Sequence, residues 1–346
     1  MNNMANMKIA TLQNPQQIIF SDAPMPQRRA GDVLIKVKRF GICGSDLHAY
    51  YGQHPFMSCP IVLGHEFSGV VEDVGAGVKD FSPGDAVTVM PQLYCGTCPQ
   101  CASGRYNICR SLKVIGCQTQ GGAAEYIAVD AGLVKKLPPG MTFEQGAMIE
   151  PAAVGVHAAK RAGVQDKNVV VLGAGTIGNL CAQAAVAQGA KTVIITDLSD
   201  YRLKVARDCG IPHAVNTKER DLGAAIDVIC GDWGADVFFE CVGVGATINQ
   251  AIELSQKGRD IVVLGVFGKR PETNMGLVQD KELRLIGSLM YTYEDYDDVL
   301  RLVPEGKIKL EPLMSAVYPF GDYARAFKDI ENDAEKMMKV IIEVEK

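Results

Sequence analysis

The chain has 346 residues, of which 47% are hydrophobic and 22% are charged, and its formal net charge is −5. This length favours two domains over one, and the composition excludes a disordered or fibrous protein. An acidic chain without a basic block is a poor match for a nucleic-acid backbone, so we expect no nucleic-acid partner.

We also expect no membrane partner. No segment approaches the run of about 18 apolar residues that marks a membrane span. The N-terminus lacks the basic start and apolar run of a signal peptide. The eleven cysteines therefore predict free thiols, metal ligands or catalytic groups in a reducing compartment, and we expect a cytoplasmic protein.

The first 150 residues alternate short strands with turns. Residues 32–38, 70–74 and 85–89 are rich in β-branched side chains, and Pro83-Gly84 is a strong turn signal before the third strand. Glycines and prolines recur between these segments, which is typical of a small irregular β-barrel.

The pattern changes near residue 150, where helices and strands begin to alternate. An alanine-rich helix over 152–162 precedes a short apolar strand over 167–172. Further expected elements are the helices 179–188, 201–208 and 246–255 and the strands 191–197, 235–240 and 260–264. This alternation predicts an α/β fold with a doubly wound parallel sheet. From about residue 290 the chain returns to two helices and a final strand over 340–344.

A glycine motif follows the first strand of this expected sheet. The segment Gly173-x-Gly175-x-x-Gly178 includes Thr176 and Ile177 and lies between a predicted strand and a predicted helix. Glycines here permit a tight turn and let the backbone approach a diphosphate, which the helix N-terminus then binds. The motif therefore predicts a dinucleotide site.

Asp197 ends the next predicted strand, nineteen residues after Gly178. An acidic residue in this context binds the ribose hydroxyls of NAD and repels the 2′-phosphate of NADP, so we expect NAD. Arg202 is close enough in sequence to bind such a phosphate, which leaves NADP open. The alternative is that the glycines only turn the chain and Asp197 caps a helix.

Four cysteines, Cys95, Cys98, Cys101 and Cys109, lie within fifteen residues of one another. Four thiolates at this spacing predict a closed, tetrahedral zinc site that stabilises a loop with little apolar content. The alternatives are disulfides and an iron–sulfur cluster, which would need a redox partner.

A second set of metal-binding residue types lies near predicted strand ends. Cys43, His65 and Glu66 offer the thiolate, imidazole and carboxylate of an open zinc site, with Glu150 as an exchanging fourth ligand or one that acts through water. Each residue also has a simpler interpretation, such as a small buried thiol for Cys43 or a solvated pair for His65-Glu66. Their occurrence together, upstream of a nucleotide motif, favours the metal site.

These motifs resemble those of zinc-dependent medium-chain dehydrogenases/reductases over nearly the whole chain. The glutamates at positions 66 and 150 make it most similar to the sorbitol (L-iditol) dehydrogenase and sugar-acid oxidoreductase branch. The resemblance implies a GroES-like β-barrel catalytic domain from residues 1–152 and 290–346, and a Rossmann domain from residues 153–289. It also implies one catalytic and one structural zinc ion per chain, with NAD as the cofactor.

The reaction that the resemblance implies is hydride transfer between a secondary hydroxyl of a polyol or sugar acid and NAD. Zinc would polarise the hydroxyl and Ser45 would take its proton. His48 would pass that proton to solvent, a role that suits histidine as a residue type. The expected cofactor site is completed by Val242, Gly265 and Val266.

The expected substrate contacts are Tyr51, Phe56 and Tyr291. Aromatic residues are, however, more often part of a core. Met290 stands where sorbitol dehydrogenases have an arginine, which argues against sorbitol itself. Lys269-Arg270 follows the loop expected near the nicotinamide, where a guanidinium could bind a sugar-acid carboxylate; a solvated loop tip is the alternative.

Two other functions stay open at this point. An L-threonine or simple alcohol dehydrogenase would share the zinc and NAD motifs, and a sensor could bind zinc and NAD without turnover. The resemblance further implies a homodimer or homotetramer. The apolar segments 261–264 and 283–289 suit such an interface, and they suit a core equally.

Overall fold

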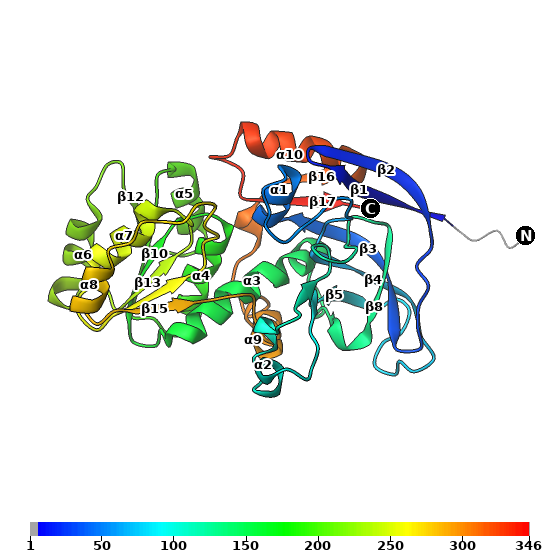
Figure 1. The fold of residues 1–346 in the computed structure, drawn as a ribbon, viewed down its shortest axis with the longest axis horizontal. Helices are drawn as coiled ribbons and strands as arrows, with labels where there is room; N and C mark the ends of the chain where they lie inside the picture. The colour runs from blue at the N-terminus through cyan, green and yellow to red at the C-terminus, as the bar shows by residue number, and fades with distance from the viewer. Residues whose placement is uncertain (1–5, 346) are drawn as a thin grey trace, which may run out of the picture. The chain divides into compact units, whose positions relative to one another are not determined.

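The computed structural model describes residues 6–345, which form two compact units (Figure 1). The first unit contains residues up to 150 and from 314 onward, and the second contains residues 151–313. Helix α3 (Phe143–Ala162) runs from one unit into the other. Within residues 6–345, no helix combines the length and apolarity needed to cross a membrane.

The first unit is built on a seven-stranded sheet to which both ends of the chain contribute. Its order is β16-β17-β3-β4-β5-β9, and β8 pairs with β3. The strands are β3 (Asp32–Ile42), β4 (Glu66–Val74), β5 (Ala86–Val89), β8 (Tyr126–Asp130), β9 (Val134–Lys136), β16 (Met314–Pro319) and β17 (Lys339–Glu343). The strands predicted near residues 32, 70 and 85 are confirmed. Strand β3 is longer than expected because its last residues pair with β17.

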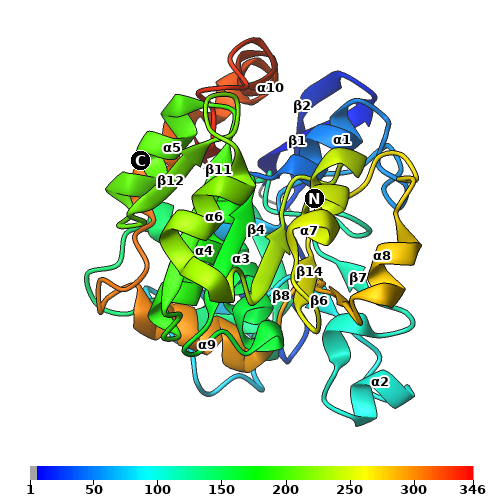
Figure 2. The ribbon, with the colours of Figure 1, turned by 90° about the vertical axis from the view of Figure 1, so that its left-hand side faces the viewer.

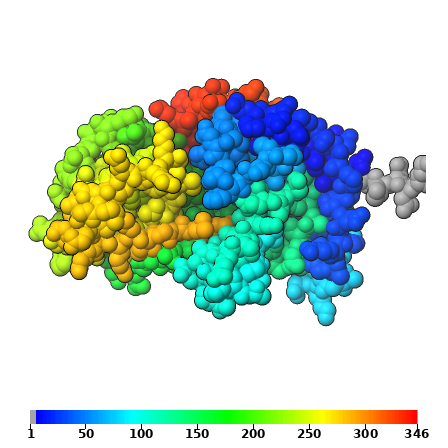
Figure 3. Space-filling view, viewed as in Figure 1, coloured from blue at the N-terminus to red at the C-terminus, as the bar shows by residue number. Residues whose placement is uncertain are grey.

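The core of this unit also combines both chain ends. Alternating residues of β3, namely Val33, Ile35 and Val37, are fully buried, as a strand with a core-facing side requires. Helix α10 (Tyr323–Asn332) adds Tyr323 and Phe327 to the same core. The C-terminal segment therefore lies beside the N-terminal one, as the red and blue surfaces of Figure 3 show.

Several shorter elements complete the first unit. Strands β1 (Asn6–Asn14) and β2 (Gln17–Pro24) form a separate hairpin. Helix α1 (Gly44–Tyr50) follows β3 directly. The antiparallel pair of β6 (Gln92–Leu93) and β7 (Lys113–Val114) brackets the four-cysteine loop and its short helix α2 (Pro99–Ala102).

The second unit contains a six-stranded parallel sheet in the order β12-β11-β10-β13-β14-β15. Figure 2 labels three of these strands, β11, β12 and β14. Its strands are β10 (Asn168–Leu172), β11 (Thr192–Asp197), β12 (His213–Asn216), β13 (Val237–Glu240), β14 (Asp260–Val263) and β15 (Arg284–Gly287). The connecting helices are α4 (Thr176–Ala187), α5 (Asp200–Asp208), α6 (Leu222–Cys230), α7 (Gly245–Leu254) and α8 (Met275–Asp280). All five residues of β10 are buried, as expected for a strand covered on both faces. The predicted parallel sheet is confirmed.

The second unit continues past residue 289, where the sequence analysis ended the Rossmann domain, to Leu313. Helix α9 (Tyr293–Leu302) accounts for the difference. Its buried Asp295 lies 2.6 Å from His157 Nδ1 and 2.8 Å from Lys160 Nζ, and both partners belong to the part of α3 in this unit. These ion pairs tie α9 to the second unit, whereas we had expected residues 290–313 in the catalytic domain.

Candidate metal centres and cofactor site

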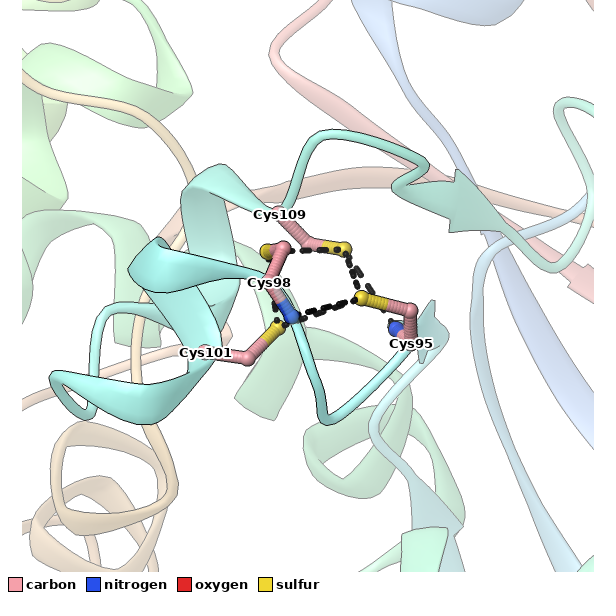
Figure 4. A group of neighbouring side chains, drawn as sticks. All are labelled: Cys95, Cys98, Cys101 and Cys109. Carbon is pink, nitrogen blue, oxygen red and sulfur yellow. Dashed lines mark hydrogen bonds between the residues drawn. The ribbon is translucent and has the colours of Figure 1, made fainter.

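The four predicted cysteine ligands converge in one loop (Figure 4). The sulfur atoms of Cys98 and Cys101 are 3.5 Å apart, as are those of Cys95 and Cys109, and the remaining measured separations are 3.9 Å. Thiolates about 2.3 Å from a tetrahedral zinc ion are about 3.8 Å apart. The separations fit that ion and exceed the disulfide bond length of about 2.05 Å, so the disulfide alternative is excluded.

The backbone of this loop favours the thiolate form of Cys95. The N–H groups of Thr97 and Cys98 lower the pKa of Cys95 to about 5, whereas burial raises the pKa of Cys101 to about 12. The Cys98 N–H lies 3.3 Å from the Cys95 sulfur. The loop therefore offers one preformed thiolate around which a cation could assemble the other three.

Cys43, His65 and Glu66 form the second group of candidate ligands. One ligand atom from each lies within 4.8 Å of the others, so the three side chains could hold one metal ion. The chain brings them together because β3 leads into Cys43, while Glu66 begins the neighbouring strand β4 opposite Gly41. A Cβ at Gly41 would collide with the Glu66 carboxylate, so any larger residue there would have to displace that carboxylate.

The imidazole of His65 is buried and faces two acceptors. Its Nδ1 lies 3.6 Å from Asp46 Oδ1 and 3.8 Å from the Cys117 sulfur. Burial lowers the pKa of His65, but Asp46, Cys117 and Cys43 together raise it well above its usual value. The Asp46 carboxylate favours the tautomer protonated at Nδ1, which leaves Nε2 as the metal-binding nitrogen.

Glu66 is paired with a lysine that the sequence analysis did not identify. Lys339 Nζ lies 2.6 Å from both Glu66 oxygens and donates to the Ile42 carbonyl at 3.2 Å. Lys339 is 3% exposed and Glu66 is fully buried. Burial lowers the pKa of Lys339, but Glu66 and Cys43 raise it by a larger amount. The net shift of the pKa is upward, so the ammonium stays charged. No motif surrounds Lys339 in the sequence, and only the pairing of β17 with β3 places it here.

The remaining predicted residues of the catalytic site lie near this group without joining it. Ser45 and His48 are partly exposed on α1, three residues apart and therefore on one face of the helix. Glu150 is buried in α3 and its charge reaches Lys339, but it is not among the side chains whose donor atoms cluster. The structure thus groups three of the four expected ligands.

The glycine motif forms the turn that we expected. Gly173 has a φ of 96°, which other residues rarely adopt, and a Cβ at Gly178 would collide with the Gly173 carbonyl. Helix α4 begins at Thr176, followed by Ile177, with Gly175 as its N-cap. Strand, turn and helix therefore have the geometry that binds a diphosphate.

Asp197 lies at the end of β11 beside this turn. Its carboxylate accepts the N–H groups of Ala174, Leu198 and Ser199 at 2.8–2.9 Å, and Arg202 Nη1 is 3.8 Å away. A cavity of about 790 Å³ is lined by the turn, Asp197, Arg202 and Val242. Of the cofactor residues expected from sequence, five line this one cavity of the second unit, namely Gly173, Gly175, Asp197, Arg202 and Val242. Thr176, Ile177, Gly178 and the loop after β14 are not part of its lining.

That loop contains Gly265 and Val266. The side chains of Val242 and Val266 are 44% and 66% exposed at the ends of β13 and β14. The Gly265 N–H donates to the Glu240 carbonyl at 3.0 Å, and the Glu240 carboxylate accepts the Val242 N–H at the same distance. Buried Glu240, which we had not identified, therefore ties the two loops together.

The three residues expected to contact the substrate differ in how exposed they are. Phe56 is 75% exposed and Tyr51 is partly buried against Tyr50. Tyr291 is fully buried, with its ring centroid 5.5 Å from that of Tyr296, so it offers no surface to a ligand. Lys269 and Arg270 are exposed and have no ion-pair partner within residues 6–345.

Two family models match the chain. The model for the alcohol dehydrogenase GroES-like domain matches residues 29–139, and the model for zinc-binding dehydrogenases matches residues 176–305. The first match covers Cys43, His65, Glu66 and the four-cysteine loop, and the second begins at Thr176, after the first two glycines of the turn.

Similar proteins include dehydrogenases of sugar derivatives. The chain is 35% identical to a 2-dehydro-3-deoxy-L-galactonate 5-dehydrogenase of Pseudoalteromonas atlantica, over 94% of both chains. It is 38% identical to the galactitol 1-phosphate 5-dehydrogenase of Escherichia coli K12, over 88% of this chain and 90% of that protein. An Escherichia coli CFT073 alcohol dehydrogenase solved with NADH has a TM-score of 0.90 and 30% identity, covering 98% of this chain and 99% of that one.

Proposed function

Because the chain belongs to the zinc-binding dehydrogenases with an alcohol dehydrogenase GroES-like domain, we propose that it transfers a hydride between a secondary hydroxyl of a polyol or sugar acid and NAD. The observation that carries this proposal is the group of Cys43 with the buried His65 and Glu66, which Asp46 and Lys339 contact. A thiolate, an imidazole and a carboxylate are the donors of an open zinc site, which leaves a position for substrate.

Cys43, His65 and Glu66 would hold the catalytic zinc ion, and the four-cysteine loop would hold a structural one. When bound at an open site, zinc acts as a Lewis acid that lowers the pKa of a hydroxyl group. Ser45 would accept the hydroxyl proton and His48 would carry it toward solvent, since both lie on the helix that starts beside Cys43. Glu150 stays a proposed ligand that exchanges or acts through water.

We propose NAD rather than NADP as the cofactor. The glycine turn would bind the diphosphate, and Asp197 would bind the adenosine ribose. The Asp197 carboxylate is held in place by three backbone N–H groups, so its negative charge is fixed where a 2′-phosphate would lie. Val242, Gly265 and Val266 would position the nicotinamide.

The substrate class rests on the similar proteins. Both named relatives act on sugar derivatives, one an oxo-acid and the other a polyol phosphate. The exposed cations of Lys269 and Arg270 suit an anionic substrate. The test is NADH formation by zinc-loaded protein with a panel of sugar alcohols, sugar acids, threonine and simple alcohols. Turnover on a polyol or sugar acid supports the proposal; turnover on threonine or ethanol alone overturns the substrate class.

We further propose that the protein is a cytoplasmic homodimer or homotetramer. Strand β15 lies at the edge of the parallel sheet, and the nearby side chains of Leu285 and Leu289 are 41% and 53% exposed. An exposed edge of this kind suits pairing with a second copy. All eleven cysteines carry free thiols, which is consistent with a reducing compartment.

A further inference from the structure

The Nδ1 atom of His65 has two neighbours that can accept a hydrogen, and they differ in distance and in kind. Asp46 Oδ1 lies 3.6 Å away, which is longer than a normal N–H···O hydrogen bond. That oxygen has no hydrogen-bond partner within residues 6–345. The Cys117 sulfur lies 3.8 Å from the same nitrogen, a distance at which the larger sulfur atom still forms a hydrogen bond. The geometry therefore pairs His65 with Cys117.

This contact is shielded from solvent on both sides. Cys117 is 8% exposed and carries a free thiol, and His65 is 6% exposed. Buried polar groups of native proteins are hydrogen-bonded, because a buried N–H without an acceptor loses its hydration without compensation. The Cys117 sulfur is therefore placed to satisfy the imidazole as well as to fill space.

Backbone packing brings Cys117 to this position. The Gly122 N–H donates to the Gly64 carbonyl at 2.7 Å. Gly116 has a φ of 83°, and a Cβ there would lie 2.6 Å from the Gly64 carbonyl group and 2.9 Å from the His65 nitrogen. The segment 116–122 thus lies on the turn that precedes His65, backbone against backbone, in a way that glycines permit.

A tight turn holds Cys117 itself. Its N–H donates to the Val114 carbonyl at 3.0 Å, and the neighbouring Gly116 N–H donates to the Thr119 carbonyl at 2.8 Å. The cysteine side chain therefore starts from a backbone that is bonded within its own turn and packed against that of His65. The contact between sulfur and imidazole follows from this arrangement.

The direction of the hydrogen bond depends on which ring nitrogen binds the metal. A neutral imidazole has one N–H and one bare nitrogen. If Nε2 of His65 binds zinc, Nδ1 carries the hydrogen and the Cys117 sulfur is its acceptor. If the thiol donated to Nδ1 instead, the hydrogen would be on Nε2, and that nitrogen could not bind the metal.

We propose that Cys117 is a positioning residue of the metal centre: its sulfur accepts the hydrogen of His65 Nδ1, with Asp46 Oδ1 as the alternative acceptor, and so keeps Nε2 available to the metal. This inference rests on the proposed zinc site. Cys117 is outside the group of side chains whose donor atoms cluster, so it acts through His65 rather than as a ligand. Partners of this kind, one step behind a metal-binding histidine, alter metal affinity when they are changed.

The first test measures how much Cys117→Ala weakens zinc binding in two backgrounds, wild type and Asp46→Asn. Chelator competition on the full chain gives the affinity, and Cys43→Ser identifies the phase that belongs to this site rather than to the four-cysteine loop. The asparagine keeps one oxygen for the Cys43 N–H, which Asp46 Oδ2 accepts at 2.9 Å, and turns an NH2 group toward His65.

The two backgrounds should respond differently because Nδ1 has one hydrogen and two possible acceptors. In the wild type, Cys117→Ala should weaken zinc binding about two- to fivefold, since Asp46 can then accept the hydrogen. In the Asp46→Asn background the same substitution leaves the N–H without an acceptor. There it should weaken zinc binding at least about tenfold.

The second test observes the His65 Nδ1 proton itself, by proton–nitrogen correlation NMR on zinc-loaded protein with isotope-labelled histidine. His65→Gln assigns the signal by its loss. Cys117→Ala should shift this signal, because the resonance of a bonded proton depends on its acceptor. A purely structural role of Cys117 would leave the acceptor, and hence the signal, unchanged.

Cys209→Ala is the matched control. Cys209 is also a buried free thiol, 6% exposed, with one long sulfur contact at 4.0 Å from the Lys309 carbonyl, and it belongs to the second unit. We expect wild-type zinc affinity and an unshifted His65 signal from this variant. Equal effects of Cys209→Ala and Cys117→Ala would overturn the inference, since they would indicate a general loss of packing.

The remaining outcomes separate this inference from the proposed function. If Cys43→Ser and His65→Gln weaken zinc binding while Cys117→Ala changes neither the affinity nor the His65 signal, the role of Cys117 is wrong and the metal centre stands. The same conclusion follows if Cys117→Ala has an equal effect in both backgrounds, because Asp46 would then not be the alternative acceptor. If Cys43→Ser and His65→Gln leave zinc binding unchanged, the metal centre itself is wrong.

Discussion

Lys339 Nζ lies 2.6 Å from both carboxylate oxygens of Glu66, and neither side chain is appreciably exposed. The pair joins β17 to β4 across β3, which lies between them in the sheet. Two charges removed from water are tolerated only when each is well paired. The candidate metal centre near the N-terminus is therefore completed by the last strand of the chain.

Replacing Lys339 by methionine should destabilise the protein by about 3–5 kcal/mol, because it leaves the Glu66 charge buried without its partner. Urea denaturation of the zinc-free proteins measures this loss. The control is the double variant Glu66→Gln/Lys339→Met, which removes both charges and should recover most of the stability. A double variant as unstable as Lys339→Met would show that the lost packing, rather than the unpaired charge, is responsible.

The ligands of the candidate metal centre could be predicted from the sequence, but the residues that support them could not. Cys43 and the His65-Glu66 pair belong to short local motifs, and the strands that carry them have a clear alternating pattern. Lys339 is far from those motifs in the chain, and it reaches the site only through the pairing of β17 with β3. Asp46 could have been identified from the sequence, because it follows Cys43 by three residues as in a capping box.

The end of the second unit could not be predicted for a related reason. Hydrophobic periodicity identifies helix α9 but not the unit that it packs against. That choice depends on Asp295, His157 and Lys160, which meet in space although Asp295 is far from the other two in sequence. The fully buried Tyr291 shows the same limit, since its aromatic character alone did not separate core from substrate contact.

The ion pairs of Asp295 should make stability depend on acid pH. Burial raises the pKa of Asp295, but hydrogen bonds from His157 and Lys160 lower it far below its usual value. A depressed pKa stabilises the folded state above the unfolded-state pKa of about 3.9, and the contribution is lost as pH falls below that value. Asp295→Asn should therefore lower the free energy of unfolding at neutral pH. Urea denaturation should also show that this free energy falls less steeply toward acid pH in the variant than in the wild type.

Asp298→Asn is the matched comparison for that measurement. Asp298 also pairs with Lys160, at 2.7 Å, but its side chain is 31% exposed. Solvent screens such a pair, so we expect a loss of less than about 1 kcal/mol and little change in the pH profile. If the stability of the two variants depended on pH in the same way, burial would not explain the stronger contribution expected from Asp295.

The cysteines of the four-cysteine loop should differ in reactivity once zinc is removed. Cys95, with a pKa of about 5, stays a thiolate at pH 6, whereas Cys101, with a pKa of about 12, stays protonated. Iodoacetamide at pH 6 should alkylate Cys95 first, as peptide mass spectrometry can show, and added zinc should protect both. Alkylation of Cys101 at the same rate as Cys95 would be inconsistent with the loop geometry.

Changing Asp197 to asparagine should shift cofactor preference toward NADP. The substitution removes the fixed negative charge and keeps one acceptor oxygen, which can serve either the Ala174 N–H or the N–H groups of Leu198 and Ser199. Arg202 would then be free to bind a 2′-phosphate. Since like charges in contact cost several kcal/mol, the ratio of kcat/KM for NADP to that for NAD should rise at least about tenfold. An unchanged ratio, in a variant with wild-type thermal stability, would remove Asp197 from the specificity site.

Hydride transfer itself is the most direct test of the central claim. The zinc-loaded protein would be given NADH deuterated at C4 together with ketoses and oxo-acids derived from the sugar alcohols and sugar acids of the panel. We predict deuterium on the new carbinol carbon of one product by mass spectrometry, and none with Cys43→Ser. Deuterium transfer by Cys43→Ser at the wild-type rate, or no transfer to any compound by zinc-loaded protein that binds NADH, would contradict the account.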